Sequence, residues 1–200
     1  MLRPALLRLA VLATVAVSSP AAAQITVQFF NGIPAAPPAL GGSFGGLTAF
    51  CTRTISSIQF TSVTDFTTFV SSNCPGAPAG FNGFSFGARF TGAFTAASAG
   101  SFTFTGSADD GNSFWIGGTN WRSSWGDQSG TYSFNATLAA GPANTFQIDY
   151  YANSFGFSFL TVNLPTGVTY TPTTVIPEPG AVPLVATGLA LLVAARRRRR

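Results

Sequence analysis

Short runs in which phenylalanine alternates with threonine, serine or glycine dominate the middle of this 200-residue chain. Such alternation places successive side chains on opposite faces of a strand, and aromatic and β-branched residues favour strands. Glycine-rich turns separate the runs, and no segment has the period of a helix. The sequence therefore predicts an all-β fold, an antiparallel β-sandwich, with a barrel as the alternative. The expected strands are residues 24–30, 54–60, 64–70, 84–96, 101–108, 112–116, 131–138, 145–151 and 157–162.

The first 23 residues have the three parts of a secretory signal peptide. Arg3 and Arg8 form a positive region, residues 9–17 are apolar, and residues 21–23 are three alanines suited to cleavage. The apolar run is too short for a permanent membrane span. We expect cleavage after residue 23, with an N-terminal membrane anchor as the alternative.

The C-terminal end has the layout of a membrane tether. Residues 24–165 form the expected exported domain, residues 166–176 a Thr- and Pro-rich spacer, and residues 177–200 the tail. The apolar residues 181–195 would rise only about 22 Å as a helix, short of the roughly 30 Å hydrocarbon core, but terminal arginines can reach the headgroups. The residues that mark the tail are Pro177, Glu178, Pro179, Arg196, Arg197, Arg198, Arg199 and Arg200.

A Pro-Glu-Pro step, an apolar helix and terminal arginines in this order resemble the PEP-CTERM sorting signal of Gram-negative, exopolysaccharide-producing bacteria. The resemblance implies that secretion machinery exports the chain and that its C-terminal helix holds it transiently in the inner membrane, on the periplasmic side. Exosortase, a membrane-embedded protease or transpeptidase, would then process the tail and deliver the domain to the cell surface or matrix. An ordinary stop-transfer anchor is the alternative.

The two ends also account for the basic character of the chain. Seven of the ten arginines lie in them, whereas residues 24–179 carry three arginines and six acidic residues, a net charge of −3. The overall charge of +4 is therefore no sign of nucleic-acid binding.

Cys51 and Cys74 are the two cysteines of the chain, and in an exported protein a pair most simply forms a disulfide. A two-cysteine metal site is the weaker alternative because the chain has no histidine. The lack of histidine also removes the usual base for a serine nucleophile, and no two carboxylates are spaced for glycoside hydrolysis. We do not expect an enzyme.

Asp109 and Asp110, followed by Gly111, are the one cluster of acidic residues. An Asp-Gly pair is common in hairpin turns, so a solvated turn is one interpretation. Neighbouring carboxylates also suit a hard cation such as Ca²⁺, which takes six to eight oxygen ligands. The local sequence leaves both interpretations open.

The surrounding residues resemble the central part of PA14 domains and of the related GLEYA adhesin domains. The resemblance covers about residues 84–165, in which an Ala-Gly turn and an aromatic-rich strand lead into Asp109-Asp110-Gly111 and a hydrophobic strand. The later segment 146–160 is similar to the penultimate strand, Asn-containing loop and final strand of these families. The resemblance leaves the region before residue 84 unassigned.

The resemblance implies a β-sandwich whose end loops bind a glycan through calcium. In the sugar-binding members two aspartates, often joined by a cis peptide bond, and a downstream asparagine hold the ion; the matching positions are Asp109, Asp110 and Asn153. Trp121 and Trp125 are candidates for an apolar wall under the sugar ring, with core packing as the alternative. The expected function is a Ca²⁺-assisted carbohydrate-binding or adhesion module. The alternative is a structural or glycan-carrying matrix protein that binds no glycan itself.

Overall fold

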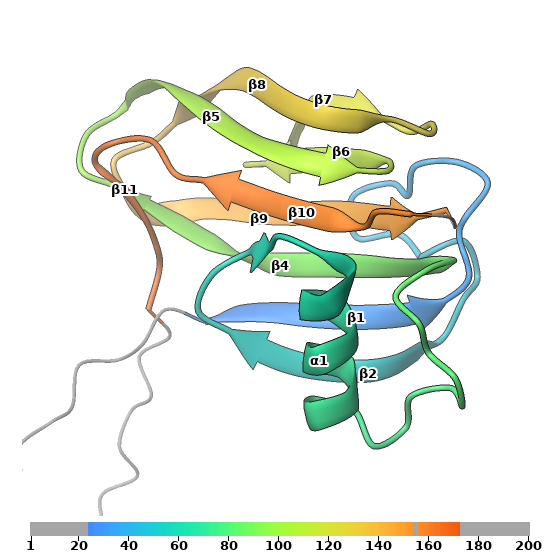
Figure 1. Cartoon of the computed structure of the whole chain (residues 1–200). Helices are drawn as coiled ribbons and strands as arrows, with labels where there is room; N and C mark the ends of the chain where they lie inside the picture. The colour runs from blue at the N-terminus through green and yellow to red at the C-terminus, as the bar shows by residue number, and fades with distance from the viewer. Residues whose placement is uncertain (1–23, 154–155, 173–200) are drawn as a thin grey trace, which may run out of the picture.

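The computed structural model describes residues 24–153 and 156–172, which form two antiparallel sheets packed face to face (Figure 1). The expected signal peptide and sorting tail lie outside the described residues. The elements are β1 (Ile25–Asn31), β2 (Ala49–Ile55), β3 (Gln59–Phe60), α1 (Val63–Asn73), β4 (Phe86–Ala96), β5 (Gly100–Asp109), β6 (Asn112–Ile116), β7 (Thr119–Ser124), β8 (Ser129–Leu138), β9 (Gly141–Ala152), β10 (Phe159–Asn163) and β11 (Val168–Tyr170). Within the described residues, no helix is both long and apolar enough to cross a membrane.

The larger sheet has seven strands in the order β2-β1-β4-β9-β6-β7, with β11 also paired to β4. The smaller sheet has the order β3-β10-β5-β8, and every strand pair in both sheets is antiparallel. The prediction of an antiparallel β-sandwich is confirmed for the described residues, with one helix added.

The alternating phenylalanines build the core between the sheets. In β1 every second side chain from Ile25 to Phe29 is buried, and the same alternation runs through the middle of β5. The rings of Phe94 in the larger sheet and Phe104 in the smaller sheet lie 5.2 Å apart between centroids. Within the smaller sheet, Phe104 stacks on Phe134 at 5.5 Å. Contacts of this kind add to the stabilisation that comes from burying the ring surface.

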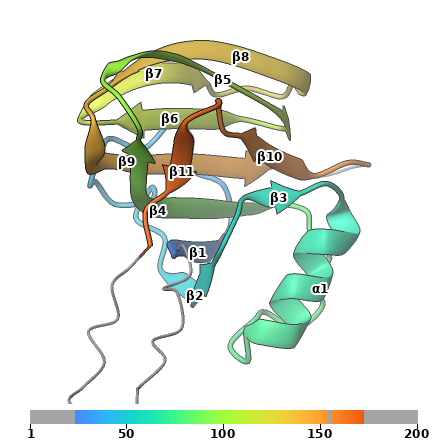
Figure 2. The same cartoon turned by 90° about the vertical axis from the view of Figure 1, so that its left-hand side faces the viewer.

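The prediction of a strand at residues 64–70 is wrong, because these residues lie in helix α1. Ser62 caps the helix, and its hydroxyl accepts a hydrogen bond from the Asp65 amide at 3.3 Å. The helix lies beside β3 and covers a part of the larger sheet that the smaller one does not reach (Figure 2). Its Phe66 ring stacks on Phe60 at 4.3 Å and on Tyr150 at 5.5 Å, so core contacts decide its place.

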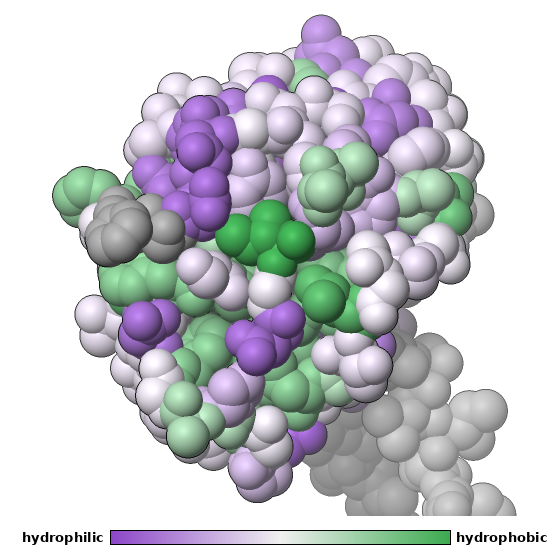
Figure 3. Space-filling model, turned by 90° about the vertical axis from the view of Figure 1, so that its right-hand side faces the viewer, coloured by the Kyte–Doolittle hydropathy of each residue, from purple (hydrophilic) through white to green (hydrophobic). Residues whose placement is uncertain are grey.

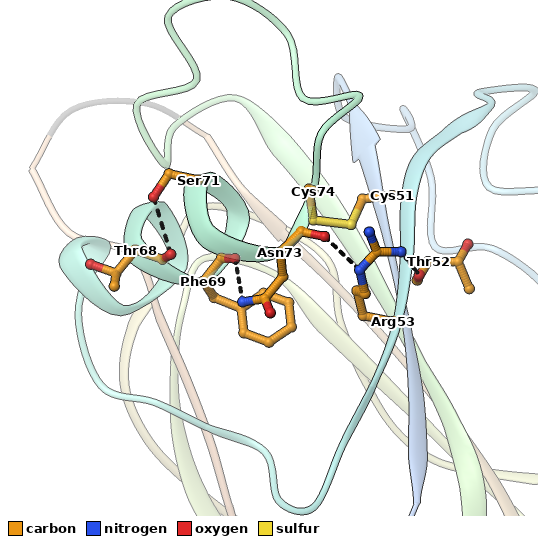
Figure 4. Close-up of a disulfide and its surroundings, with 8 residues drawn as sticks. All are labelled: Cys51, Thr52, Arg53, Thr68, Phe69, Ser71, Asn73 and Cys74. Carbon is orange, nitrogen blue, oxygen red and sulfur yellow. Dashed lines mark hydrogen bonds between the residues drawn. A yellow bond between two sulfur atoms is a disulfide. The ribbon is translucent and has the colours of Figure 1, made fainter.

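The predicted disulfide between Cys51 and Cys74 is confirmed and links β2 to the end of α1 (Figure 4). Cys74 ends the helix, and its amide donates to the Val70 carbonyl at 2.9 Å. Next to the bond, Arg53 donates to the Asn73 carbonyl, so the helix end is fixed to β2 twice. Disulfides persist in oxidising compartments and are typical of extracellular proteins.

Two strands, β7 and β11, were not expected from the sequence, and the strand expected at residues 54–60 is wrong as one element: it comprises the end of β2, a break at residues 56–58 and the short β3. No strand was predicted at residues 119–124, but β7 occupies them, and Gly117 and Gly118, both with positive φ, form the tight turn between β6 and β7. β11 pairs with β4 inside the segment expected to be a spacer, so the sheet continues past residue 165.

The loop of residues 33–46 lies on the outer face of the larger sheet. Phe44 from this loop stacks on Phe30 at 4.3 Å, and Gly87 beneath it is needed because a Cβ there would meet the ring at 2.1 Å. A buried ion pair anchors the loop: Arg89 Nε lies 2.6 Å from Asp149 Oδ1, and the same guanidinium donates to a carbonyl of the loop at 2.6 Å.

The two ends of the described chain leave the sandwich side by side. The Thr171 amide donates to the Ala93 carbonyl at 2.8 Å, and Gln24 lines the same shallow hollow as Thr171. At the opposite end of the sheet, Phe86 of β4 pairs with Ala152 of β9, beside the turn that follows β5 (Figure 1).

Candidate ligand-binding site

The Asp-Asp-Gly turn joins β5 of the smaller sheet to β6 of the larger sheet. Asp109 is the last residue of β5, and its side chain is buried. The Asp110 amide donates to the Tyr151 carbonyl at 3.2 Å, and the Tyr151 amide donates to the Gly111 carbonyl at 3.0 Å. The peptide bond between Asp109 and Asp110 is cis. The turn is therefore held by main-chain bonds to β9 rather than being a free hairpin tip.

Asn153 comes to this turn from the end of β9. Its main-chain amide donates to Asp110 Oδ2 at 2.6 Å, although 43 residues separate the two in the sequence. The structure thus brings together Asp109, Asp110 and Asn153, the three residues that the resemblance selects as cation ligands.

Asp127 is a fourth polar residue of the site, and the sequence reasoning missed it. Its Oδ1 atom accepts a hydrogen bond from Asn153 Nδ2 at 2.8 Å. It lies in the connection between β7 and β8, in a short polar turn that carries no recognisable motif. Because the amide nitrogen of Asn153 points to Asp127, the Oδ1 atom of Asn153 is left free to accept or to bind a cation.

Negative charge accumulates at Asp110. Partial burial raises the pKa of its carboxyl, and the nearby carboxylates of Asp109 and Asp127 raise this pKa further. The main-chain amide of Asn153 opposes both effects. The nearby Arg122 does not neutralise the site, because its Nε donates to Asn112 at 2.7 Å and its guanidinium lies over the Tyr132 ring. A cation beside this carboxylate would stabilise its ionised form.

The side-chain atoms of the site that could bind a metal ion are all oxygens, which suits Ca²⁺ better than zinc. Within the described residues, however, no three acidic, cysteine or histidine side chains form a metal-binding group by themselves. A cation here would therefore need uncharged oxygen ligands, such as the Asn153 amide or main-chain carbonyls, to complete its shell.

Two aromatic residues flank the carboxylates. The ring of Trp125 lies 4.8 Å from that of Tyr151, and its Nε1 donates to the carbonyl of Pro34 at 3.1 Å. Gly111 allows the Tyr151 ring to lie against the turn, because a Cβ at this position would meet that ring at 2.0 Å. Figure 3 looks onto this end of the sandwich and shows hydrophilic residues gathered beside an apolar region.

Trp121, the other tryptophan expected at the site, lies elsewhere. It belongs to β7, packs against the core, and donates from Nε1 to the Ile116 carbonyl at 3.1 Å near the β6–β7 turn. Trp125 follows the other end of this hairpin, where Asn112 pairs with Ser124 beside the Asp-Asp-Gly turn. The structure thus places one of the two tryptophans beside the carboxylates and the other against the core.

No family model matches the sequence, and no curated protein resembles it. Solved structures do resemble its fold. The PA14 domain of the MpAFP antifreeze protein matches with a TM-score of 0.54 at 14% identity, over 81% of this chain and 89% of that one. The PA14 sugar-binding domain from an RTX adhesin matches with a TM-score of 0.53 at 18% identity, over 71% and 89%.

The fold is PA14-like. Both matches extend well beyond residues 84–165, so the region before residue 84, which the sequence leaves unassigned, takes part in the same PA14-like fold.

An anti-sigma factor domain-containing protein from Clostridium clariflavum also matches, with a TM-score of 0.53 at 18% identity over 76% of this chain. This chain covers 45% of that protein, less than half of its length. At these identities the likeness establishes the fold alone.

Proposed function

We propose that the protein is an exported carbohydrate-binding or adhesion module that holds a glycan through Ca²⁺ at the turn between β5 and β6. The observation that carries the proposal is the convergence of Asp110 with Asn153 and Asp127, three oxygen-bearing side chains from three separate loops. Support also comes from the PA14-like fold, since one of the matching structures is described as a sugar-binding domain from an adhesin.

The residues have separate roles in this proposal. Asp109 and Asp110 provide the negative charge that holds the cation, and Asn153 provides an uncharged oxygen. Asp127 orients the Asn153 amide by accepting from its Nδ2 atom. When bound, Ca²⁺ would offer open coordination positions to paired sugar hydroxyls. Trp125, with Tyr151 behind it, offers an apolar surface on which the face of a sugar ring can pack.

The proposal predicts that glycan binding at the turn between β5 and β6 requires calcium. On a glycan array, the protein should bind at least one carbohydrate in Ca²⁺, and the signal should fall at least tenfold in excess chelator. Binding that is lost in chelator and restored by added Ca²⁺ supports the proposal. If no glycan binds in either condition, the proposal fails in favour of the alternative, a structural or glycan-carrying matrix protein.

The proposed location rests on residues outside the described part of the chain. The Pro177-Glu178-Pro179 step and the five terminal arginines support processing by exosortase after export. Mass spectrometry of the mature protein should find a C-terminus near Pro179 and no peptide that contains Arg200. An intact Arg200 in the mature protein would instead indicate a permanent stop-transfer anchor.

A further inference from the structure

An open groove of about 630 Å³ lies between α1 and the segment that joins β2 to β3. Its volume falls within the range of roughly 300–1,000 Å³ that is usual for small-molecule sites. None of the residues that line it belongs to the Asp-Asp-Gly site. The groove is therefore a separate hollow, formed by the helix that the sequence pattern did not predict.

One face of α1 forms a wall of the groove. Asp65, Thr68, Phe69 and Ser72 line it at the spacing i, i+3, i+4 and i+7, which places them on one side of a helix. The opposite wall is also rich in hydroxyl groups; it includes Thr54, Ser56 and Ser57.

The hydroxyl groups of the helix differ in their hydrogen bonds according to the face they occupy. Away from the groove, Thr67 donates to the Thr64 carbonyl and Ser71 to the Thr68 carbonyl, both at 3.1 Å (Figure 4 shows the second). Among the described residues, the hydroxyls of Thr68 and Ser72 have no protein partner of this kind. The groove thus presents hydroxyl groups that are available to a ligand.

The charge of the groove selects against anions. Asp65 is its charged residue, and hydrogen bonds from the Thr61 hydroxyl and amide, both 2.7 Å long, hold the pKa of its carboxyl below the usual value. Among the described residues that line the groove, none is basic, and the adjoining Arg53 donates to the main-chain carbonyls of Asn73 and Thr52. The half-buried Phe69 ring, edge-on to Phe60 at 5.7 Å, adds an apolar surface. The groove offers hydroxyl groups and an aromatic ring, but its lining has no basic side chain that could pair with an acidic ligand. These properties fit a neutral, hydroxyl-rich ligand.

We infer that this groove binds a neutral oligosaccharide and is a second glycan site that works without calcium. The inference shares its ligand class with the proposed function, but it does not depend on the Asp-Asp-Gly turn. A glycan chain too long for one site could contact both, which would raise the overall affinity through a higher effective concentration.

The test measures binding by the whole protein in excess chelator, with neutral tetrasaccharides (cellotetraose, maltotetraose and mannotetraose) and tetragalacturonate as probes. At least one neutral probe should bind, and the acidic probe should not. Ser72→Tyr, which fills the groove from an exposed position, should weaken binding at least tenfold. Ser71→Tyr is the matched control at a neighbouring position that does not line the groove, and this variant should bind like the wild type.

Asp110→Asn should leave this binding unchanged, which separates it from the calcium site. Three results would overturn the inference: no neutral probe binds in chelator, tetragalacturonate binds better than the neutral probes, or Ser72→Tyr binds as tightly as Ser71→Tyr. Equal melting temperatures of the two tyrosine variants would show that a loss of binding is not a loss of folding. If this site fails, binding that requires Ca²⁺ and Asp110 would still support the proposed function.

Discussion

Replacing Asp110 by asparagine is expected to abolish the thermal stabilisation that Ca²⁺ gives to the wild-type protein. A ligand that binds only the folded state at one hundred times its dissociation constant adds about 2.7 kcal/mol to the free energy of unfolding. For a domain of this size, that corresponds to a rise in melting temperature of roughly 5–11 °C. Asp110→Asn keeps the shape of the side chain but removes the charge that the cation needs.

Asp65→Asn is the matched control, because it removes one carboxylate from α1, far from the turn. It should keep the full calcium-induced shift. The calcium site would be contradicted if Ca²⁺ did not raise the melting temperature of the wild type, or if it raised that of Asp110→Asn by as much as that of the wild type.

The calcium-induced shift should also depend on pH. The folded state raises the pKa of Asp110, so protonation of this carboxyl favours folding. Without Ca²⁺, the contribution of the protonated carboxyl to the free energy of unfolding is lost as the pH rises through the raised pKa. Calcium needs the ionised form and competes with the proton. The difference in melting temperature with and without Ca²⁺ should therefore shrink between pH 7 and pH 4.5, while contributions from distant groups cancel in that difference.

Removing the disulfide should lower the free energy of unfolding by about 3 kcal/mol. Cys51 and Cys74 lie 23 residues apart, and in the chain-entropy model a closed loop of this length restricts the unfolded chain by this amount. The double variant Cys51→Ala and Cys74→Ala should melt roughly 6–12 °C below the wild type.

Reduction of the wild-type protein provides the control, since it opens the same loop without changing a side chain in size. It should lower the melting temperature by a similar amount and should have no effect on the double-alanine variant. A reduced wild type that melts at the same temperature as the oxidised form would disprove the stabilising role of the bond.

The period-2 pattern predicted most of the sandwich because each strand carries its own signal. Helix α1 was wrongly predicted as a strand because Thr64, Thr67 and Val70 are β-branched, and Phe66 and Phe69 also favour strands. Two short features of the sequence indicate a helix instead. Ser62 followed three residues later by Asp65 matches a helix cap, and Phe66 and Val70 are four residues apart. Here burial against Phe60 and Tyr150 outweighs the intrinsic preference of the residues.

The candidate site was predictable where it resembles a known motif and unpredictable elsewhere. The motif selects Asp109, Asp110 and Asn153, and the fold brings them together. Asp127 reaches the site only because the β7–β8 connection folds back beside Asn153, and a loop contact of this kind leaves no local pattern. The positions of Trp121 and Trp125 likewise depend on β7, a strand that the sequence pattern did not predict after the neighbouring glycines.

Both ends of the described chain leave the sandwich at the end opposite the Asp-Asp-Gly turn. On β4, Ala93 beside the chain ends and Phe86 beside the Asp-Asp-Gly turn lie seven residues apart, or roughly 23 Å. Attachment through either end would leave the same loops pointing outward, at the distal tip.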